Sequence, residues 1–247
     1  MKIRNYALLF VLLLMFSACK KEASDPLTIP VDFTSTTYET LGTYNSSGTP
    51  NYLLPKDSVT PAMQSYIANT LVEKGDLRTT HPELLSSSAI ADITITKSST
   101  VFVTFVSQVT NNKNALAFYT YPTNNPPAVA KDIKTITYIF PSVGEGTTLQ
   151  AGDKVKIGTF EVGTSIGLVL MRDAWLSATA TLDNSAVHYC TNDVLNPEVK
   201  ADLKKHAVLI NYAPENKTLV GFENTNRTLK SCDNDFNDVV IYVTVTP

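Results

Sequence analysis

Short hydrophobic segments alternate with turn residues along most of the chain after residue 88. Segments of this length, bounded by Gly, Pro and Asn, are typical of β-strands. The predicted strands are residues 89–96, 101–109, 115–121, 133–140, 154–162, 166–171, 207–212, 218–223 and 239–246. Many short strands with little helix predict a mainly β protein: an antiparallel β-sandwich, jelly-roll-like, with one short N-terminal helix. Segments 101–106 and 239–245 are apolar on both faces, which is typical of central strands.

The one predicted helix lies before these strands. Thr60 can cap it, Pro61 suits its first turn, and Gly75 can end it. Its apolar side chains recur every four residues, at Met63, Ile67 and Leu71. Such a stripe indicates a face that packs against the sheet. Less regular patterns suggest a strand at 29–34 and a short helix that begins at Asn196 and Pro197.

The first residues have the features of an export signal. Lys2 and Arg4 precede an apolar segment, residues 6–16, that is too short to span a bilayer. Small residues and Cys19 follow, which resembles the lipobox of bacterial lipoproteins, although Phe16 stands where Leu is commoner. We therefore expect an outer-membrane lipoprotein, anchored through lipid on Cys19 and facing the periplasm or the cell surface. The alternative is an ordinary signal peptide with a chance cysteine.

These patterns divide the chain into four parts: a lipoprotein signal peptide (1–18), a flexible tether (19–51), an N-terminal extension with the short helix (52–84) and a β-sandwich domain (85–247). The formal net charge is −3 and the pI about 5.6, without a cluster of basic residues. A nucleic-acid partner is therefore not expected.

Two cysteines remain in the chain if Cys19 carries lipid. Cys232 directly precedes an acidic segment, and a disulfide from Cys232 to Cys190 would brace that segment. The alternative is two independent buried thiols, because nothing in the sequence fixes the distance between them.

The acidic segment, residues 233–238, has the sequence Asp-Asn-Asp-Phe-Asn-Asp and leads directly into the last strand. Two carboxylates about 4 Å apart repel each other by roughly 4 kcal/mol at an effective dielectric constant near 20. Phe236 and the strand that follows should hold the segment against a core, so a cation is needed to neutralise it. Oxygen ligands at alternating positions favour Ca²⁺. A polar turn is the alternative. An EF-hand is excluded, since its sixth and twelfth positions require Gly and Glu and are here Asp238 and Thr244.

Several segments together resemble a domain of unknown function, family 4114, in LruC-type lipoproteins of Bacteroidetes and related bacteria. The resemblance covers about residues 85–247 and is carried by residues 103–106, 114–121, 139–141, 152–153, 163–167, 195–197, 221–224 and 233–240. It implies a β-sandwich whose acidic segment holds calcium. The implied ligands are Glu223, Asp233, Asp235 and Asp238, with Asn224 and Asn237 as weaker candidates. Asn224 stands where the family often has Asp, which removes one possible anionic ligand.

Pairing of residues 218–223 with 239–246 as adjacent antiparallel strands would bring Glu223 and Asp238 together at neighbouring strand ends. Asp233 and Asp235, in the connecting loop, would then fold over them. Three or more anionic oxygens would surround one point, as a calcium site requires.

No enzymatic motif appears in a suitable context. Residues 163–167 match Gly-x-Ser-x-Gly, but a strand rather than a helix is predicted after Ser165, contrary to a nucleophile elbow. His81, His188 and His206 show no zinc-ligand spacing. We expect a non-enzymatic binding or adhesion module for a glycan or a surface protein. A purely structural envelope protein is the alternative, and a polysaccharide hydrolase is a third.

Four aromatic residues are candidates for stacking on sugar rings, although packing in the core is the commoner role for each of them. They are Trp175, Tyr119, Tyr121 and Tyr189.

Overall fold

The computed structural model describes residues 28–29, 31–89 and 91–247. The predicted signal peptide, Cys19 and the first part of the tether lie outside the described residues. Among the residues that the structure describes, no helix is long and apolar enough to cross a membrane.

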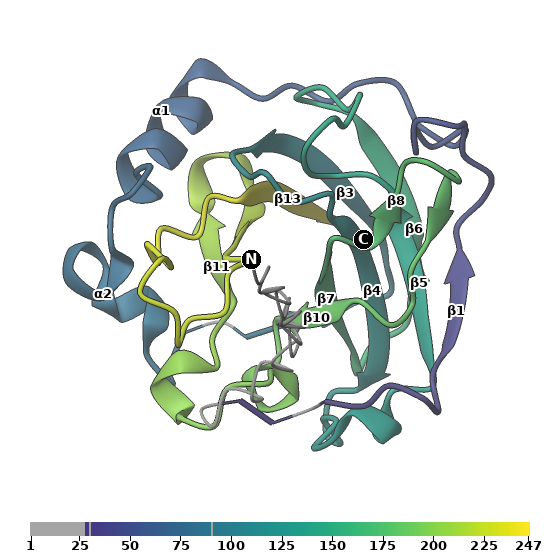
Figure 1. Ribbon diagram of the computed structural model, residues 1–247. Coiled ribbons are helices and arrows are strands. Elements are labelled where there is room, and N and C mark those ends of the chain that lie inside the picture. Colours follow the sequence, from purple (N-terminus) through teal and green to yellow (C-terminus); the bar gives the residue numbers. More distant parts are fainter. Residues whose placement is uncertain (1–27, 30, 90) are drawn as a thin grey trace, which may run out of the picture.

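Two β-sheets form the molecule (Figure 1). The first sheet contains β1 (Thr37–Thr40), β5 (Thr135–Phe140), β4 (Ala115–Pro122), β7 (Thr164–Arg172) and β10 (Val187–Cys190) in that order, with β2 (Ile93–Thr94) also paired to β7. The second contains β11 (Ala207–Tyr212), β12 (Lys217–Phe222), β13 (Val239–Thr246), β3 (Ser99–Gln108) and β6 (Lys154–Phe160). A separate hairpin pairs β8 (Trp175–Leu176) with β9 (Thr181–Leu182).

The predicted mainly β sandwich is confirmed. Each of the nine predicted strands overlaps an observed strand, and β13 and β3 lie inside the second sheet as their two apolar faces indicated. Pairing is antiparallel, apart from the parallel pair of β1 and β5. Side chains from both sheets meet in one buried cluster that includes Val103, Leu168 and Ile241.

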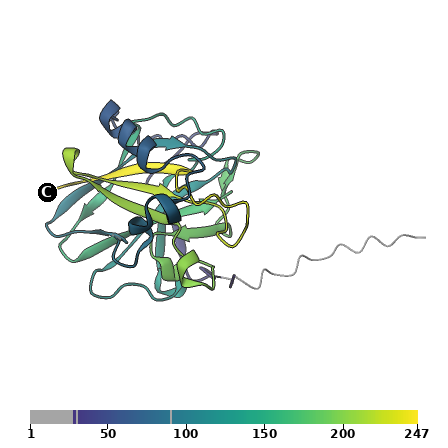
Figure 2. The same ribbon diagram turned by 90° about the vertical axis from the view of Figure 1, so that its left-hand side faces the viewer.

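The outer face of each sheet is also covered. Phe33, in the segment before β1, packs against the first sheet beside Tyr138 and Val169. The second sheet is covered by α1 (Pro61–Thr70) and by the segment that contains α2 (Leu77–Thr80). Figure 2 shows the blue helix α1 lying over the yellow strand β13. Covered outer faces explain why β3 and β13 lack a regular polar alternation.

Helix α1 begins where the sequence predicts, because the hydroxyl of Thr60 accepts a hydrogen bond from the N–H of Met63 (3.2 Å). It ends at Thr70, with Leu71 as its C-terminal cap, rather than close to Gly75. The apolar stripe packs against the second sheet as expected.

Two other predictions were wrong. The early strand lies at β1, Thr37–Thr40, rather than at 29–34. The region after Pro197 contains a short 3₁₀ helix instead of an α-helix. The 3₁₀ helices are η1 (Pro82–Leu85), η2 (Ala130–Asp132), η3 (Asp193–Leu195), η4 (Ala201–Leu203) and η5 (Ala213–Glu215).

Candidate metal centre

The acidic segment connects β12 to β13 at one end of the second sheet. These strands pair antiparallel, with Phe222 opposite Val239. Glu223 comes directly after Phe222 and Asp238 directly before Val239, so the two carboxyl groups lie at neighbouring strand ends. The Asp238 Oδ2 atom accepts a hydrogen bond from the backbone N–H of Asn224 (2.7 Å). The predicted pairing of the strands and the proximity of their ends are therefore confirmed.

A buried aromatic ring anchors the segment, as the sequence indicated. Phe236 is fully buried against the second sheet and α1. Both Asn234 and Phe236 have left-handed backbone conformations, with φ near 59° and 57°, which fold the segment tightly. Gly221 on β12 makes room for it, because a Cβ atom at Gly221 would lie 2.3 Å from the carbonyl oxygen of Phe236.

The turn between α1 and α2 docks directly onto the acidic segment. The Lys74 N–H donates to Asp235 Oδ2 (2.8 Å), and the Leu77 N–H donates to the carbonyl oxygen of Asn234 (3.0 Å). The Asn237 Nδ2 atom donates to Glu73 Oε2 (3.2 Å). These contacts fix residues of the N-terminal extension against a loop near the C-terminus.

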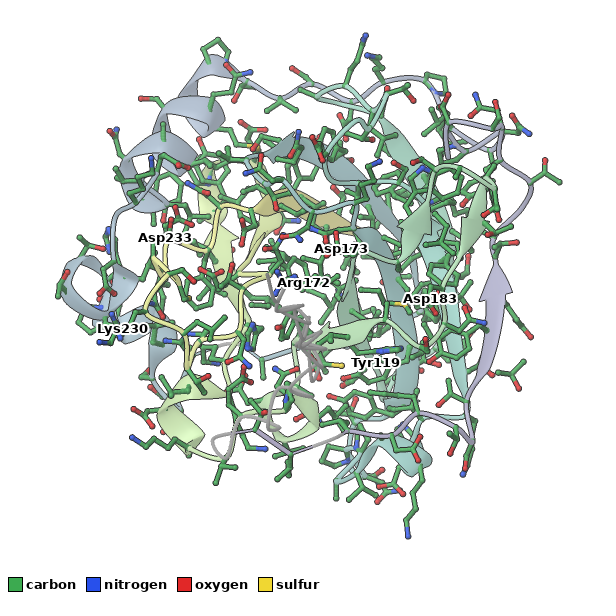
Figure 3. The ribbon with its side chains drawn as sticks, viewed as in Figure 1. Tyr119, Arg172, Asp173, Asp183, Lys230 and Asp233 are labelled. Atoms are coloured by element: carbon green, nitrogen blue, oxygen red, sulfur yellow. The ribbon has the colours of Figure 1, made fainter. Side chains whose placement is uncertain are left out.

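Docking brings a third carboxylate to the loop. Oxygen atoms of Glu73, Asp233 and Asp235 all lie within 4.8 Å of one another. Figure 3 shows Asp233 on the loop that faces the α1–α2 turn. The side chain of Asp235 is buried, whereas that of Glu73 is 49% exposed. Lys74 Nζ is 4.0 Å from Glu73 Oε1, but its side chain is 80% exposed and neutralises the cluster weakly.

A second pair of carboxyl groups lies deeper in the loop. Glu223 has no exposed surface; its Oε1 accepts from the N–H of Thr225 (2.9 Å), and its Oε2 has no hydrogen-bond partner among the described residues. Burial, together with the negative charge of Glu223, raises the pKa of Asp238 to about 9. The pKa of Asp235 is raised to about 6, because burial and the charges of Asp233 and Glu223 outweigh two backbone hydrogen bonds that lower it.

Glu223, Asp233, Asp235 and Asp238 therefore influence one another electrostatically. Of these four, however, only Asp233 and Asp235 belong, with Glu73, to the group whose oxygen atoms lie within 4.8 Å of one another. The predicted convergence of all four on one point is therefore only partly observed.

The carboxamides serve chiefly to position these carboxyl groups. Asn224 Nδ2 donates to Thr110 Oγ1 (2.6 Å), and its backbone N–H holds Asp238. Asn237 Nδ2 donates to the Leu71 carbonyl oxygen (3.4 Å) as well as to Glu73, which leaves its own Oδ1 as the possible ligand. Glu73 was missed by sequence reasoning, since no local pattern marks it and only tertiary docking brings it to the loop.

Of the two alternatives for the cysteines, the structure agrees with two independent buried thiols. Cys190 and Cys232 are both free and buried. Cys190 belongs to β10 and packs on the outer face of the first sheet, whereas Cys232 lies in the loop next to the acidic segment. Burial raises the pKa of each thiol well above its usual range, so both stay neutral.

Ser165 lies within β7, without the strand-to-helix turn of a nucleophile elbow. Its hydroxyl contacts those of Thr123 (2.9 Å) and Thr94 (3.4 Å) rather than a histidine. His206 Nε2 instead lies 3.0 Å from Glu198 Oε1 in a buried pair.

Three of the four aromatic candidates for sugar stacking, Trp175, Tyr119 and Tyr189, are buried. The hydroxyl of Tyr121 donates to Asp92 Oδ2 (2.5 Å). Core packing is therefore the role of the three buried rings.

A groove of about 870 Å³ runs between the segment before β1 and the edge strand β10. Its wall includes Phe33, which stacks on His188 with ring centroids 4.2 Å apart. His188 Nδ1 donates to the Ala186 carbonyl oxygen (2.7 Å), so Nε2 accepts the hydroxyl of Tyr38 (2.7 Å). Burial lowers the pKa of His188 to about 4, consistent with a neutral ring. Leu229, from the loop that carries the acidic segment, completes the groove.

The comparisons with known proteins give one match. Residues 160–246 match the family described as Domain of unknown function (DUF4114). No curated protein and no solved structure matches the chain. The match is shorter than the resemblance over 85–247 and excludes Glu73, although it includes Glu223 and the whole acidic segment. The C-terminal part of the chain, from the end of β6 through β13, is thus similar to the DUF4114 domain family.

Proposed function

We propose that the protein is a lipid-anchored, calcium-binding β-sandwich of the cell envelope, of LruC type, which binds a glycan or a surface protein. The observation that carries the calcium assignment is the convergence of Glu73, Asp233 and Asp235 beside the buried carboxyl groups of Glu223 and Asp238. The lipid anchor at Cys19 and the envelope location rest on the sequence of the first residues.

The charges of this cluster lack a protein partner. Among the described residues, none of the carboxylates of Asp233, Asp235, Glu223 and Asp238 forms an ion pair with Lys, Arg or His. Buried carboxylates without a cation remain charged only at a high cost in free energy. A bound divalent cation held by Glu73, Asp233 and Asp235 removes that cost.

The ligand chemistry favours calcium. The converging atoms are carboxylate and carboxamide oxygens on a loop, whereas zinc prefers Cys and His ligands. Cys232 is nearby, but its raised pKa keeps it a neutral thiol and a poor ligand. Calcium accepts irregular arrangements of several oxygens, which suits ligands from two distant parts of the chain better than the strict octahedron of magnesium does.

Calcium would act by holding the loop between β12 and β13. Asn226 and Leu229 from this loop line the groove beside His188 and Tyr38. A loop fixed by a cation binds its ligand with less loss of conformational freedom. The groove has the size of a small-ligand site and combines rings with the polar side chains of Arg172 and Asn184, a composition that suits a saccharide.

A glycan array probed with the purified protein, with calcium and with EGTA, tests this function. Calcium-dependent binding that is lost on Tyr38→Ala substitution is expected. If the protein binds calcium but no glycan or protein ligand, the purely structural role in the envelope would be favoured. Turnover of chromogenic glycosides would instead indicate a hydrolase.

A further inference from the structure

A second, smaller pocket is also lined by the loop between β12 and β13. It has a volume of about 500 Å³ and is bounded by α2, the segment around η4 and residues 227–234. Four cationic side chains and one carboxylate line it: Arg78, Lys200, Arg227, Lys230 and Asp202. The pocket is therefore positive, although the chain as a whole has a net charge of −3.

Arg227 forms the fixed base of this pocket and is only 3% exposed. Its Nε donates to Asn234 Oδ1 (2.8 Å), and its Nη1 donates to the carbonyl oxygens of Asp202 (3.1 Å) and Lys205 (3.0 Å). The guanidinium also lies over the ring of Phe236, 5.3 Å from its centroid. These contacts hold the guanidinium in one position.

All of these acceptors are uncharged. Among the described residues Arg227 forms no ion pair, and its Nη2 atom has no hydrogen-bond partner. Burial lowers the pKa of Arg227, and the charge of Arg78 adds to this effect, whereas the negative charges of Glu223 and Glu198 oppose it. A buried guanidinium without a carboxylate in direct contact is unusual, because arginine inside proteins is commonly paired with an anion.

Two lysines at the rim are free to contact a ligand. Lys200 and Lys230 are exposed, and neither forms an ion pair among the described residues. Figure 3 shows Lys230 beside α2, on the same loop as Asp233. Arg78, by contrast, is already paired with Asp76 (2.6 Å) and adds mainly to the local potential.

We propose that this pocket binds an oxyanion group, with Arg227 at its base and Lys200 and Lys230 at its rim. The ligand is a sulfate, a phosphate or a saccharide carboxylate, since each presents several charged oxygens to guanidinium and ammonium donors. The cationic residues of this pocket are not among the proposed calcium ligands, so anion binding does not require calcium. Arg227 nevertheless contacts the acidic segment through Asn234.

Isothermal titration calorimetry of the purified protein in metal-free buffer tests the proposal. Sodium sulfate, sodium phosphate and methyl glucuronide are titrated at constant ionic strength set with sodium chloride. We expect saturable binding of one anion per chain, with a dissociation constant in the millimolar range. Binding of the glucuronide alone identifies a saccharide carboxylate as the source, whereas binding of sulfate or phosphate identifies the inorganic or ester group.

The variant Lys200→Ala/Lys230→Ala removes both rim charges from exposed positions and should fold normally. We expect about five- to tenfold weaker binding from the loss of two exposed charge contacts. The matched control is Lys97→Ala/Lys156→Ala, at exposed positions outside the pocket, which should bind as the unaltered protein does. Absence of saturable binding by the unaltered protein, or equal affinities of the two double variants, would overturn the proposal.

Discussion

Substitution of Glu73 by Gln isolates the carboxylate that the N-terminal extension brings to the acidic loop. The change keeps the size of the side chain and the acceptor for Asn237 Nδ2, but removes one negative charge from the cluster with Asp233 and Asp235. Without calcium, the loss of repulsion should leave the free energy of unfolding unchanged or slightly higher. With calcium, the variant should be stabilised less than the unaltered protein.

The expected size follows from ligand linkage. Extracellular calcium sites have dissociation constants of about 10⁻⁴ to 10⁻³ M. At about 10 mM calcium such a site stabilises the fold by roughly 1.4–2.7 kcal/mol, which raises the melting temperature by about 3–10 °C for a domain of this size. Because Glu73 is half exposed, we expect its charge to contribute about tenfold in affinity, which lowers the calcium stabilisation to about 0.4–1.4 kcal/mol.

The assay is thermal unfolding followed by circular dichroism, with about 10 mM calcium or with EGTA. The calcium concentration is chosen to exceed the expected dissociation constant. Glu145→Gln is the matched control, because Glu145 is exposed and lies outside the cluster. Equal calcium-induced shifts in Glu73→Gln and in the control would show that Glu73 is not a ligand. A large loss of stability of Glu73→Gln in EGTA would refute the electrostatic argument itself.

Three further predictions concern packing and protons. Gly221→Ala should cost about 1–3 kcal/mol in urea unfolding and weaken calcium binding, since the new Cβ would lie 2.3 Å from the Phe236 carbonyl oxygen; unchanged stability would contradict the close approach. The pKa of His188 is lowered from its ordinary value of 6.5 to about 4 in the folded protein. Between these pH values the unfolded chain therefore binds more protons than the folded protein does. Stability should therefore fall by roughly 2–3 kcal/mol as the pH drops from 7 to 4.5, and His188→Gln should flatten this dependence. Since the pKa of Asp238 without a metal is about 9, calcium binding at pH 7 should release about one proton, seen as a calorimetric enthalpy that varies with the buffer; an enthalpy independent of the buffer would contradict this.

The strands could be predicted because their pattern is local. Segments that are apolar on both faces identified β3 and β13 as strands inside a sheet. The pairing of β12 with β13 could be predicted because the two strands are close in the sequence. The strand β10 was missed because it is only four residues long and polar at His188. The end of α1 was predicted too late, since Leu71 continues the apolar repeat although it already caps the helix.

The site could be predicted only where its ligands are neighbours in the sequence. Residues 233–238 could be recognised by their high density of acidic side chains. Glu223 was implied by the family resemblance, and the predicted strand pairing agreed with it. Glu73 could not be predicted from its neighbours in the sequence, because it reaches the acidic segment only through hydrogen bonds between the α1–α2 turn and that segment. The sequence left the pairing of Cys190 and Cys232 open for a similar reason, because it contains no information on the distance between them.

Equilibrium dialysis of the purified protein against calcium, followed by elemental analysis, shows whether the acidic cluster binds the ion. We expect at least one calcium ion per chain at millimolar concentration, and its loss on Asp235→Asn substitution. Uptake of no calcium by the folded, unaltered protein at concentrations up to about 10 mM, the upper range for extracellular sites, would contradict the calcium assignment.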